Sequence, residues 1–192
     1  IISPQYYYMP GDTVKIQLSS YEIHTSEVFD VRVYLIKDPE TFLTKQNNRG
    51  MFSIIGRDSS NLMNILEEVR AFKKTIFPTR VKNTDQFVFR GTTSYLPPQK
   101  GAYIMRISHK NKILTCGFFV TNLAILTRFT QNAVLNYTSD RMTTEPVDSV
   151  KFKVYFNTVK LGEGISPGSA LAYTFSWKDK ESLYRTGTTY PL

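Results

Sequence analysis

The stretch from Tyr103 to Asp140 constrains the fold of this chain more than any other, because it predicts four strands in close succession. Alternating apolar and polar residues give each strand pattern, and short polar turns separate the members of each pair. The second pair starts at Thr121 with no linker after the first. The four predicted strands lie at 103–107, 113–120, 121–127 and 133–139. We therefore expect one antiparallel β-sandwich to end near residue 120 and a second to begin at once.

The composition supports a strand-rich globular protein. A length of 192 residues suits one large domain or two of about 100 residues. The apolar share of 41% is ordinary for a folded protein and too high for a disordered one. The 13 Phe and 12 Tyr stand against a single Trp, and aromatic enrichment favours strands.

The net charge of +8 is dispersed along the chain. Residues 1–120 hold 16 basic and 10 acidic residues, a net of +6, while residues 121–192 hold 8 and 6, a net of +2. No run of Lys and Arg is longer than two residues. Because nucleic-acid-binding proteins usually gather their basic residues on one face or motif, we expect no nucleic-acid partner.

Cys116 is the only cysteine, so no intrachain disulfide can form. Its neighbours fit a strand, which favours a buried, apolar thiol. A cysteine nucleophile would need a histidine as its base. The two histidines, His24 and His109, both lie in polar, turn-like sequence, and we expect no catalytic pair.

Other motifs that carry chemistry are absent from the sequence. It contains no phosphate-binding glycine loop, no CxxC and no HExxH, and the Gly162–Pro167 segment fits neither glycine-loop type. Glu67 and Glu68 are adjacent and read as solvated surface, and the glycosylation sequon at 136–138 lies in a strand pattern. We expect Trp177 to be a core residue. The sequence thus predicts no catalytic, cofactor-binding or metal-binding residues, no cofactor and no enzymatic activity.

The ends of the chain and its hydropathy bear on where it works. No stretch of 18 apolar residues occurs, so we expect no transmembrane segment. The chain opens on Ile1 and not on Met. This suggests a piece of a longer precursor, whose export signal would lie outside the sequence.

Residues 61–74 interrupt the strand patterns and predict one helix within the first domain. Apolar residues there recur at spacings of three and four, which is typical of one helix face. They are Leu62, Ile65, Leu66, Val69 and Phe72. We interpret the helix as a cover over an edge or open end of the first sandwich. A helix that docks a partner protein is the alternative.

The remaining segments complete the two predicted units. In the first, a turn at Tyr8–Asp12 precedes strands over 13–19, 27–36 and 84–91. In the second, strands over 151–157, 170–177 and 183–186 flank a glycine-rich segment over 159–169. We expect that segment to be a long, mobile loop. Because a seven-stranded sandwich needs about 100 residues, the second unit is expected to be incomplete at Leu192.

Six short motifs carry a family resemblance. They are Tyr8–Val14, Val33–Glu40, Gly101-Ala102-Tyr103, Val120-Thr121-Asn122-Leu123, Leu135–Asp140 and Thr144-Glu145-Pro146-Val147. In this order and spacing they resemble consecutive macroglobulin domains of bacterial alpha-2-macroglobulin-like proteins. The family's crossover reads Val-Thr-Asp-Leu, so Asn122 stands here in place of Asp. Likewise Thr143-Thr144-Glu145 stands in place of Thr-Gly-Lys.

The resemblance implies an all-β fold of tandem antiparallel immunoglobulin-like (macroglobulin-type) β-sandwiches, here with the helical insertion near 61–74. The domains would be 1–120 and 121–192. The family's implied activity is the trapping of proteases by the full-length molecule, often with an internal thioester formed by Cys-Gly-Glu-Gln. Cys116 is followed by Gly117-Phe118-Phe119, so this piece carries no thioester.

The leading interpretation is therefore a non-catalytic structural segment of an alpha-2-macroglobulin-like protein. Its implied partners are other domains of the same longer chain and, through the full-length protein, proteases. Its implied location is extracytoplasmic: periplasmic, envelope-anchored or secreted. The alternative is a generic immunoglobulin-like surface adhesion or protein-interaction module, whose exposed loops bind a protein or glycan.

Overall fold

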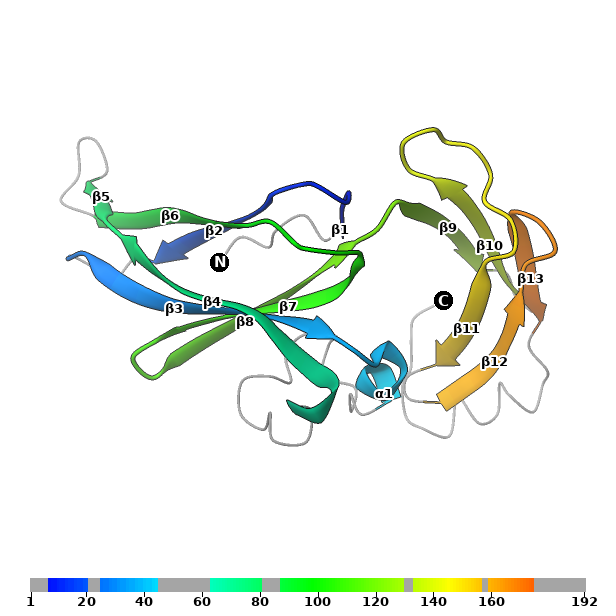
Figure 1. The fold of residues 1–192 in the computed structure, drawn as a ribbon, viewed down its shortest axis with the longest axis horizontal. Coiled ribbons are helices and arrows are strands. Elements are labelled where there is room, and N and C mark those ends of the chain that lie inside the picture. Colours follow the sequence, from blue (N-terminus) through cyan, green and yellow to red (C-terminus); the bar gives the residue numbers. More distant parts are fainter. Residues whose placement is uncertain are drawn as a thin grey trace. The chain divides into compact units, whose positions relative to one another are not determined.

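The computed structural model describes residues 7–20, 25–44, 63–80, 87–129, 133–156 and 159–174, and most of these residues lie in strands (Figure 1). The chain divides into two compact units, residues 1–121 and 122–192. His24, Trp177 and the strand predicted at 183–186 lie outside the described residues.

The first unit contains eight described strands in two sheets. They are β1 (Tyr7–Tyr8), β2 (Val14–Ser20), β3 (Glu27–Ile36), β4 (Leu66–Ile76), β5 (Pro78–Arg80), β6 (Phe87–Tyr95), β7 (Gly101–His109) and β8 (Lys112–Val120). One sheet has the order β1-β8-β7-β3-β4 and the other β2-β6-β5. Neighbouring strands are antiparallel, except that β1 runs parallel to β8. The strand predicted at 27–36 is confirmed, and β6 extends the strand predicted at 84–91 to Tyr95.

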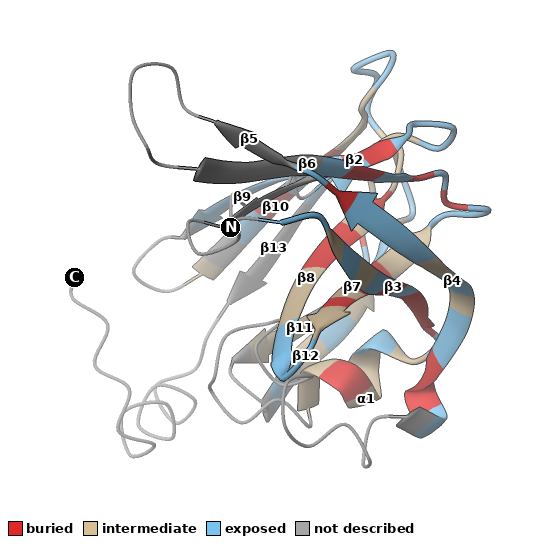
Figure 2. Cartoon of the chain, turned by 90° about the vertical axis from the view of Figure 1, so that its left-hand side faces the viewer, coloured by how far each residue is buried: buried red, intermediate tan, exposed pale blue. Residues whose placement is uncertain are grey.

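The inner faces of the two sheets share one hydrophobic core, which defines the unit as a β-sandwich (Figure 2). The buried members are Tyr8, Val14, Val31, Val33, Leu35, Ile76, Tyr95, Tyr103, Met105, Ile107, Phe118 and Val120. They come from β2 and β6 in one sheet and from all five strands of the other. The all-β sandwich class predicted from the alternating patterns is therefore confirmed for this unit.

A second buried cluster lies at one end of β3, away from the inner core. The short helix α1 (Pro39–Thr44) contributes Phe42, and the 3-10 turn η2 (Met63–Ile65) contributes Ile65. Asp38 caps the helix by accepting a hydrogen bond from the Thr41 backbone N–H at 3.0 Å. The cluster also contains Tyr34, Ile36, Leu66 and Ile104. This is why residues 33–36 are buried in succession, although strand residues alternate between faces.

The helix predicted at 61–74 is wrong, because Leu66–Ile76 forms strand β4. A bulge opposite Val33 and Tyr34 leaves Val69 without a cross-strand partner and shifts the alternation. Leu66 consequently joins the outer cluster, whereas Val69 and Phe72 pack against the inner core. A bulged strand that contacts two cores thus produces the three-and-four spacing of a helix. Leu62, the remaining residue of the pattern, lies outside the described residues.

The turn predicted at Tyr8–Asp12 is confirmed and leads from β1 to β2. The Asp12 N–H donates to the Met9 carbonyl at 3.0 Å, and the Met9 N–H donates to Asp12 Oδ2 at 2.8 Å. Gly11 has a φ of 91° at the third position of the turn, where a type II turn needs a positive φ. Tyr8 anchors the turn to the core, with its ring edge-on to Phe118.

Gly11→Ala should lower the free energy of unfolding of the first unit by about 1–2 kcal/mol, the cost of a left-handed conformation for a residue with Cβ. No atom lies within 4 Å of the position that a Cβ would take, so the cost is conformational and not steric. Urea denaturation of the two proteins measures the difference. An unchanged midpoint would show that the turn does not hold Gly11 at this φ.

The second unit contains a three-stranded and a two-stranded sheet in its described part. Its strands are β9 (Leu123–Phe129), β10 (Ala133–Asp140), β11 (Lys151–Phe156), β12 (Val159–Ile165) and β13 (Ala170–Thr174). The order β13-β10-β9 is antiparallel, and β11 pairs with β12. Because β8 and β9 belong to different sheets, residues 101–140 do not form one continuous sheet.

The mobile loop predicted at 159–169 is wrong over most of its length, because Val159–Ile165 is strand β12. Gly162 and Gly164 lie opposite Val154 and Phe152 of β11, next to an irregularity in the register. Glycine is common where a strand bends or bulges, so these glycines mark an irregular strand and not a loop. No helix in the described part of the chain is long and apolar enough to cross a membrane.

Candidate functional site

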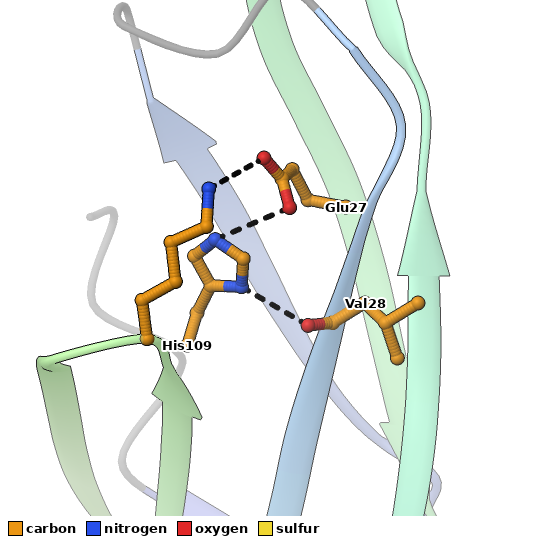
Figure 3. Close-up of polar contacts among 4 residues, drawn as sticks. Glu27, Val28 and His109 are labelled. Carbon is orange, nitrogen blue, oxygen red and sulfur yellow. Dashed lines mark hydrogen bonds and ion pairs between the residues drawn. The ribbon is translucent and has the colours of Figure 1, made fainter.

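The described residues gather their main titratable cluster where β3 begins and β7 ends (Figure 3). The β3–β7 register pairs Asp30 with Ser108, which brings Glu27 and Val28 close to His109. Lys110 follows in the tight turn between β7 and β8, with a φ of 50°. The cluster therefore joins residues about 80 positions apart in sequence.

His109 is held by contacts on both ring nitrogens and on one ring face. Its Nδ1 lies 3.0 Å from the Val28 carbonyl oxygen, and its Nε2 lies 3.4 Å from Glu27 Oε2. Its ring stacks on Phe29 with a centroid distance of 4.7 Å. The contacts tie the end of β7 to the start of β3.

The contacts that the described residues make in this cluster are those of a structural clamp. A catalytic histidine needs a nucleophile or a substrate proton within hydrogen-bond reach. In His109 the Val28 carbonyl oxygen contacts Nδ1 and the Glu27 carboxylate contacts Nε2. Cys116 lies on β8 opposite Met105, four residues along β7 from His109, which is about 13 Å at the rise of a strand. The pair of His109 and Cys116 considered from sequence is therefore not assembled.

Glu27 should make the first unit more stable above pH 4 to 5 than in acid. The hydrogen bond from Lys110 Nζ, 2.9 Å from Oε1, holds the pKa of Glu27 below its ordinary value of 4.5, and the charges of Lys110 and His109 act in the same direction. A carboxyl group whose pKa is lowered by folding stabilises the fold at pH values above its pKa in the unfolded chain. This contribution is lost as the pH falls through its pKa in the folded protein. Glu27→Gln should flatten the dependence of Tm on pH between about 2 and 6, and Lys110→Met should do so too. Curves that stay parallel to that of the wild type would contradict this.

Cys116, predicted to be a buried, apolar thiol, is partly buried. It packs against the inner core, and its Sγ lies 3.7 Å from the Met105 carbonyl oxygen. Burial raises the pKa of the Cys116 thiol to about 12. Because the thiolate is the reactive species, this cysteine is inert near neutral pH.

The first unit should lose stability in alkali. Burial raises the pKa of Tyr95 to about 12 as well. A group whose pKa is raised by folding contributes its full stability at pH values below its pKa in the unfolded chain, which is about 9 for Cys and 10 for Tyr. The contribution is lost as the pH rises toward 12. Each group should contribute a slope of about 1.4 kcal/mol per pH unit within its window. In urea denaturation, Cys116→Val should remove the loss of stability that begins at pH 9 to 10. If the loss still begins there, folding does not raise the pKa of this thiol.

Tyr103 and Gly101 explain why the Gly-Ala-Tyr motif occurs at the start of β7. The Tyr103 hydroxyl donates to the Gln99 carbonyl at 2.7 Å, while its ring stacks on Phe118 at a centroid distance of 5.2 Å. Such a tyrosine corner is typical of immunoglobulin-like sandwiches. Gly101 has a φ of 158°, and a Cβ there would lie 2.7 Å from Leu35 Cδ1. Both residues of the motif are therefore structural.

In the second unit, the side chains of Asn122 and Asp140 are joined by a hydrogen bond. Asp140 accepts hydrogen bonds from the backbone N–H groups of Met142 at 2.8 Å and Thr143 at 3.1 Å, and from Asn122 Nδ2 at 3.0 Å. The two backbone bonds, and then the Asn122 bond, lower the pKa of Asp140. An aspartate at position 122 would face this carboxylate with a like charge. Asn122, which stands in place of the aspartate of the Val-Thr-Asp-Leu pattern, can instead donate a hydrogen bond to Asp140.

The remaining residues singled out from sequence are also structural. Asn136 of the sequon is buried, and its Oδ1 accepts a hydrogen bond from Thr127 Oγ1 at 2.8 Å. Glu67 and Glu68 lie exposed on β4, paired with Lys37 at 3.4 Å and Arg32 at 3.2 Å. Among the described residues, no group of three or more His, Cys, Asp or Glu side chains is arranged to hold a metal ion.

Comparison with known proteins places the fold. No family model matches the sequence, and no curated protein matches it either. The structure is similar to a crystal structure of native alpha-2-macroglobulin from Escherichia coli that spans domains NIE-MG1, with a TM-score of 0.60 and 11% sequence identity over 92% of this chain and 89% of that one. It is equally similar to a longer fragment spanning MG0-NIE-MG1, with a TM-score of 0.61, 11% identity and coverage of 92% and 59%.

The class of fold is thus that of alpha-2-macroglobulin domains, in an arrangement of two successive units. The resemblance predicted from six short motifs is confirmed as a likeness of fold. Sequence identity of 11% carries the likeness no further than the fold.

Proposed function

We propose that this chain is a pair of non-catalytic structural domains of an alpha-2-macroglobulin-like protein. The observation that carries the proposal is the similarity to the NIE-MG1 fragment, which extends over 92% of this chain and 89% of that one. Since both chains are covered almost completely, the first unit would take the place of the NIE domain and the second that of MG1. The parent molecule would work outside the cytoplasm and trap proteases.

The side-chain contacts support a structural role. Three of the short sequence motifs form a turn, a tyrosine corner and a hydrogen-bonded crossover, and each stabilises its own unit. The one cysteine is partly buried with a raised pKa, and the histidine of the described region has a contact on each ring nitrogen. These contacts support a role in positioning other parts of a larger molecule.

One observation favours the alternative of a surface interaction module. Three large apolar residues of the second unit, Leu126, Leu135 and Tyr137, are 70%, 40% and 39% exposed. The β9–β10 register places Leu126 directly opposite Tyr137. Leu135 lies two residues from Tyr137 on β10, and so on the same face of the sheet. Exposed apolar groups on one sheet face suit protein or glycan contacts.

Two assays on the 192-residue chain separate these functions. The proposal expects no loss of activity when a panel of endopeptidases is incubated with the chain, and no mass adduct with methylamine. Stoichiometric loss of protease activity, or an adduct at a glutamine, would overturn the assignment as scaffold. Saturable binding to a glycan array that Leu126→Asp and Tyr137→Asp abolish would favour the adhesion module instead.

A further inference from the structure

Two arginines lie side by side on the outer face of the five-stranded sheet. The β3–β7 register pairs Arg32 directly with Arg106. Because side chains alternate between the two faces of a strand, both arginines point away from the inner core. The residues before and after them, which belong to that core, are Val31, Val33, Met105 and Ile107. Directly opposed side chains start only about 4.5–5.5 Å apart, and like charges in such a pair repel each other.

The charged groups around the pair leave one positive charge in excess. Glu68 of β4 forms an ion pair with Arg32, with 3.2 Å between Oε2 and Nη1. Asp30 and Lys73 lie directly opposite each other in the β3–β4 register, on the same face. Three cations thus stand against two carboxylates, a net of +1. The neighbouring positions of this face on β8 are uncharged: Ile113, Thr115 and Gly117.

Arg106 has no counter-ion of its own in the described part of the chain. The Glu68 carboxylate is paired with Arg32, and no ion pair with another described carboxylate is formed by Arg106. The Arg106 Nε is buried and has no hydrogen-bond partner, although the side chain as a whole is only partly buried. A donor that is shielded from water and lacks an acceptor costs free energy. Arg106 is therefore a partly desolvated cation that lacks an acceptor.

The arginine pair is exposed toward β4 and bordered by apolar groups in the next row of the sheet. The side chains of Arg32 and Glu68 are 56% and 40% exposed, and Ala71, opposite Arg32 on β4, is exposed too. Two residues further along, Tyr34 and Ile104 are buried in the outer cluster. An apolar border strengthens the attraction between opposite charges. An anion can thus approach over β4 and meet donors that are already partly dehydrated.

We propose that Arg32 and Arg106 form a binding site for a carboxylate group, supplied by a glutamate or aspartate side chain of a partner protein. Guanidinium forks match the two oxygens of a carboxylate. One carboxylate cancels the net charge of +1, whereas a phosphate dianion would bring a second negative charge close to Glu68. A partner protein can also contact the exposed groups of β4 at the same time, which a free carboxylate ion cannot do.

Titration of the 192-residue chain with a capped tripeptide that has a central glutamate tests this site. The shielded Nε–H of Arg106 should exchange slowly with water, so its ¹H–¹⁵N resonance can be followed. At about 20 mM sodium chloride, where charges are weakly screened, we expect a saturable shift with a dissociation constant of about 1–100 mM. The same tripeptide with a central glutamine is the matched control and should give no saturable shift.

Three variants separate a built site from general attraction by a basic protein. Arg106→Gln should weaken binding of the glutamate tripeptide at least about 10-fold, and Arg106→Lys, which keeps the charge but loses the fork, at least about 3-fold. Arg70→Gln removes an equal charge from β4 at the position opposite Val33, and its binding should stay within about 2-fold of the wild type. If circular dichroism shows that the Arg106 variants are poorly folded, Arg32→Gln replaces an exposed residue and should weaken binding as Arg106→Gln does.

Three results would overturn the proposal. One is a shift of the Arg106 resonance that is absent or does not saturate up to about 200 mM tripeptide. Another is equal weakening by Arg70→Gln and Arg106→Gln, because the net charge alone would then attract the peptide. Tighter binding of sodium acetate or of inorganic phosphate than of the glutamate tripeptide would overturn the assignment to an acidic side chain.

Discussion

Replacing Tyr103 by alanine should lower the free energy of unfolding of the first unit by about 3–5 kcal/mol. The side chain is fully buried, stacks on Phe118 and meets Tyr95 edge-on at a centroid distance of 6.4 Å. Its removal leaves a cavity between the two sheets and removes the hydrogen bond to the Gln99 carbonyl. Urea denaturation, with hydrogen exchange on β7 to assign the transition to the first unit, measures the loss.

Tyr103→Phe separates the packing of the ring from the hydrogen bond of the hydroxyl. It keeps the ring and should cost about 0.5–1.5 kcal/mol, the net value of one intramolecular hydrogen bond. The alanine variant should therefore lose at least twice as much as the phenylalanine variant. Equal losses would show that the hydroxyl contact dominates and that the ring contributes little to the core.

Leu66→Ala should destabilise the first unit by about 2–5 kcal/mol. Leu66 is 7% exposed and packs in the cluster formed with Ile36, Phe42 and Ile104. Truncation removes contacts from that cluster and leaves a cavity beneath α1. Leu96→Ala is the matched control, since Leu96 is 61% exposed and its truncation should change the stability by less than about 0.5 kcal/mol.

The same experiment tests the burial of Leu66 in this cluster. A residue that is not buried would leave the stability of the isolated chain nearly unchanged when truncated. A melting temperature of Leu66→Ala equal to that of Leu96→Ala would contradict the buried cluster. A large difference between the two variants would support it.

The sequence predicts the class of the fold well, because period-two alternation is a local property of a half-buried strand. The strand at 27–36 and the turn at Tyr8–Asp12 are found where the alternation and the Pro-Gly pair place them. Strand β4 could not be predicted in the same way. Its bulge at Val69 depends on pairing with β3, which is distant in sequence, and it imitates the period of a helix.

The contacts of the candidate site are likewise set by tertiary structure. The sequence around His109 does not predict that Glu27 will face it, because the β3–β7 register alone brings the two residues together. The helix α1 escapes a periodicity search because six residues are too few to show a repeat. The place of Cys116 in a strand that packs against the core, by contrast, follows from its neighbours, although the residue is only partly buried.

The most direct test of the proposed function uses the full-length protein that the proposal calls for, with this chain as one part of it. It should be mixed in equal amounts with an endopeptidase, and the remaining activity measured on a large protein substrate and on a small peptide substrate. A protease-trapping, alpha-2-macroglobulin-like molecule predicts loss of cleavage of the large substrate with the small-substrate activity retained. Full retention of both activities, with the parent protein intact or merely degraded, would contradict the account.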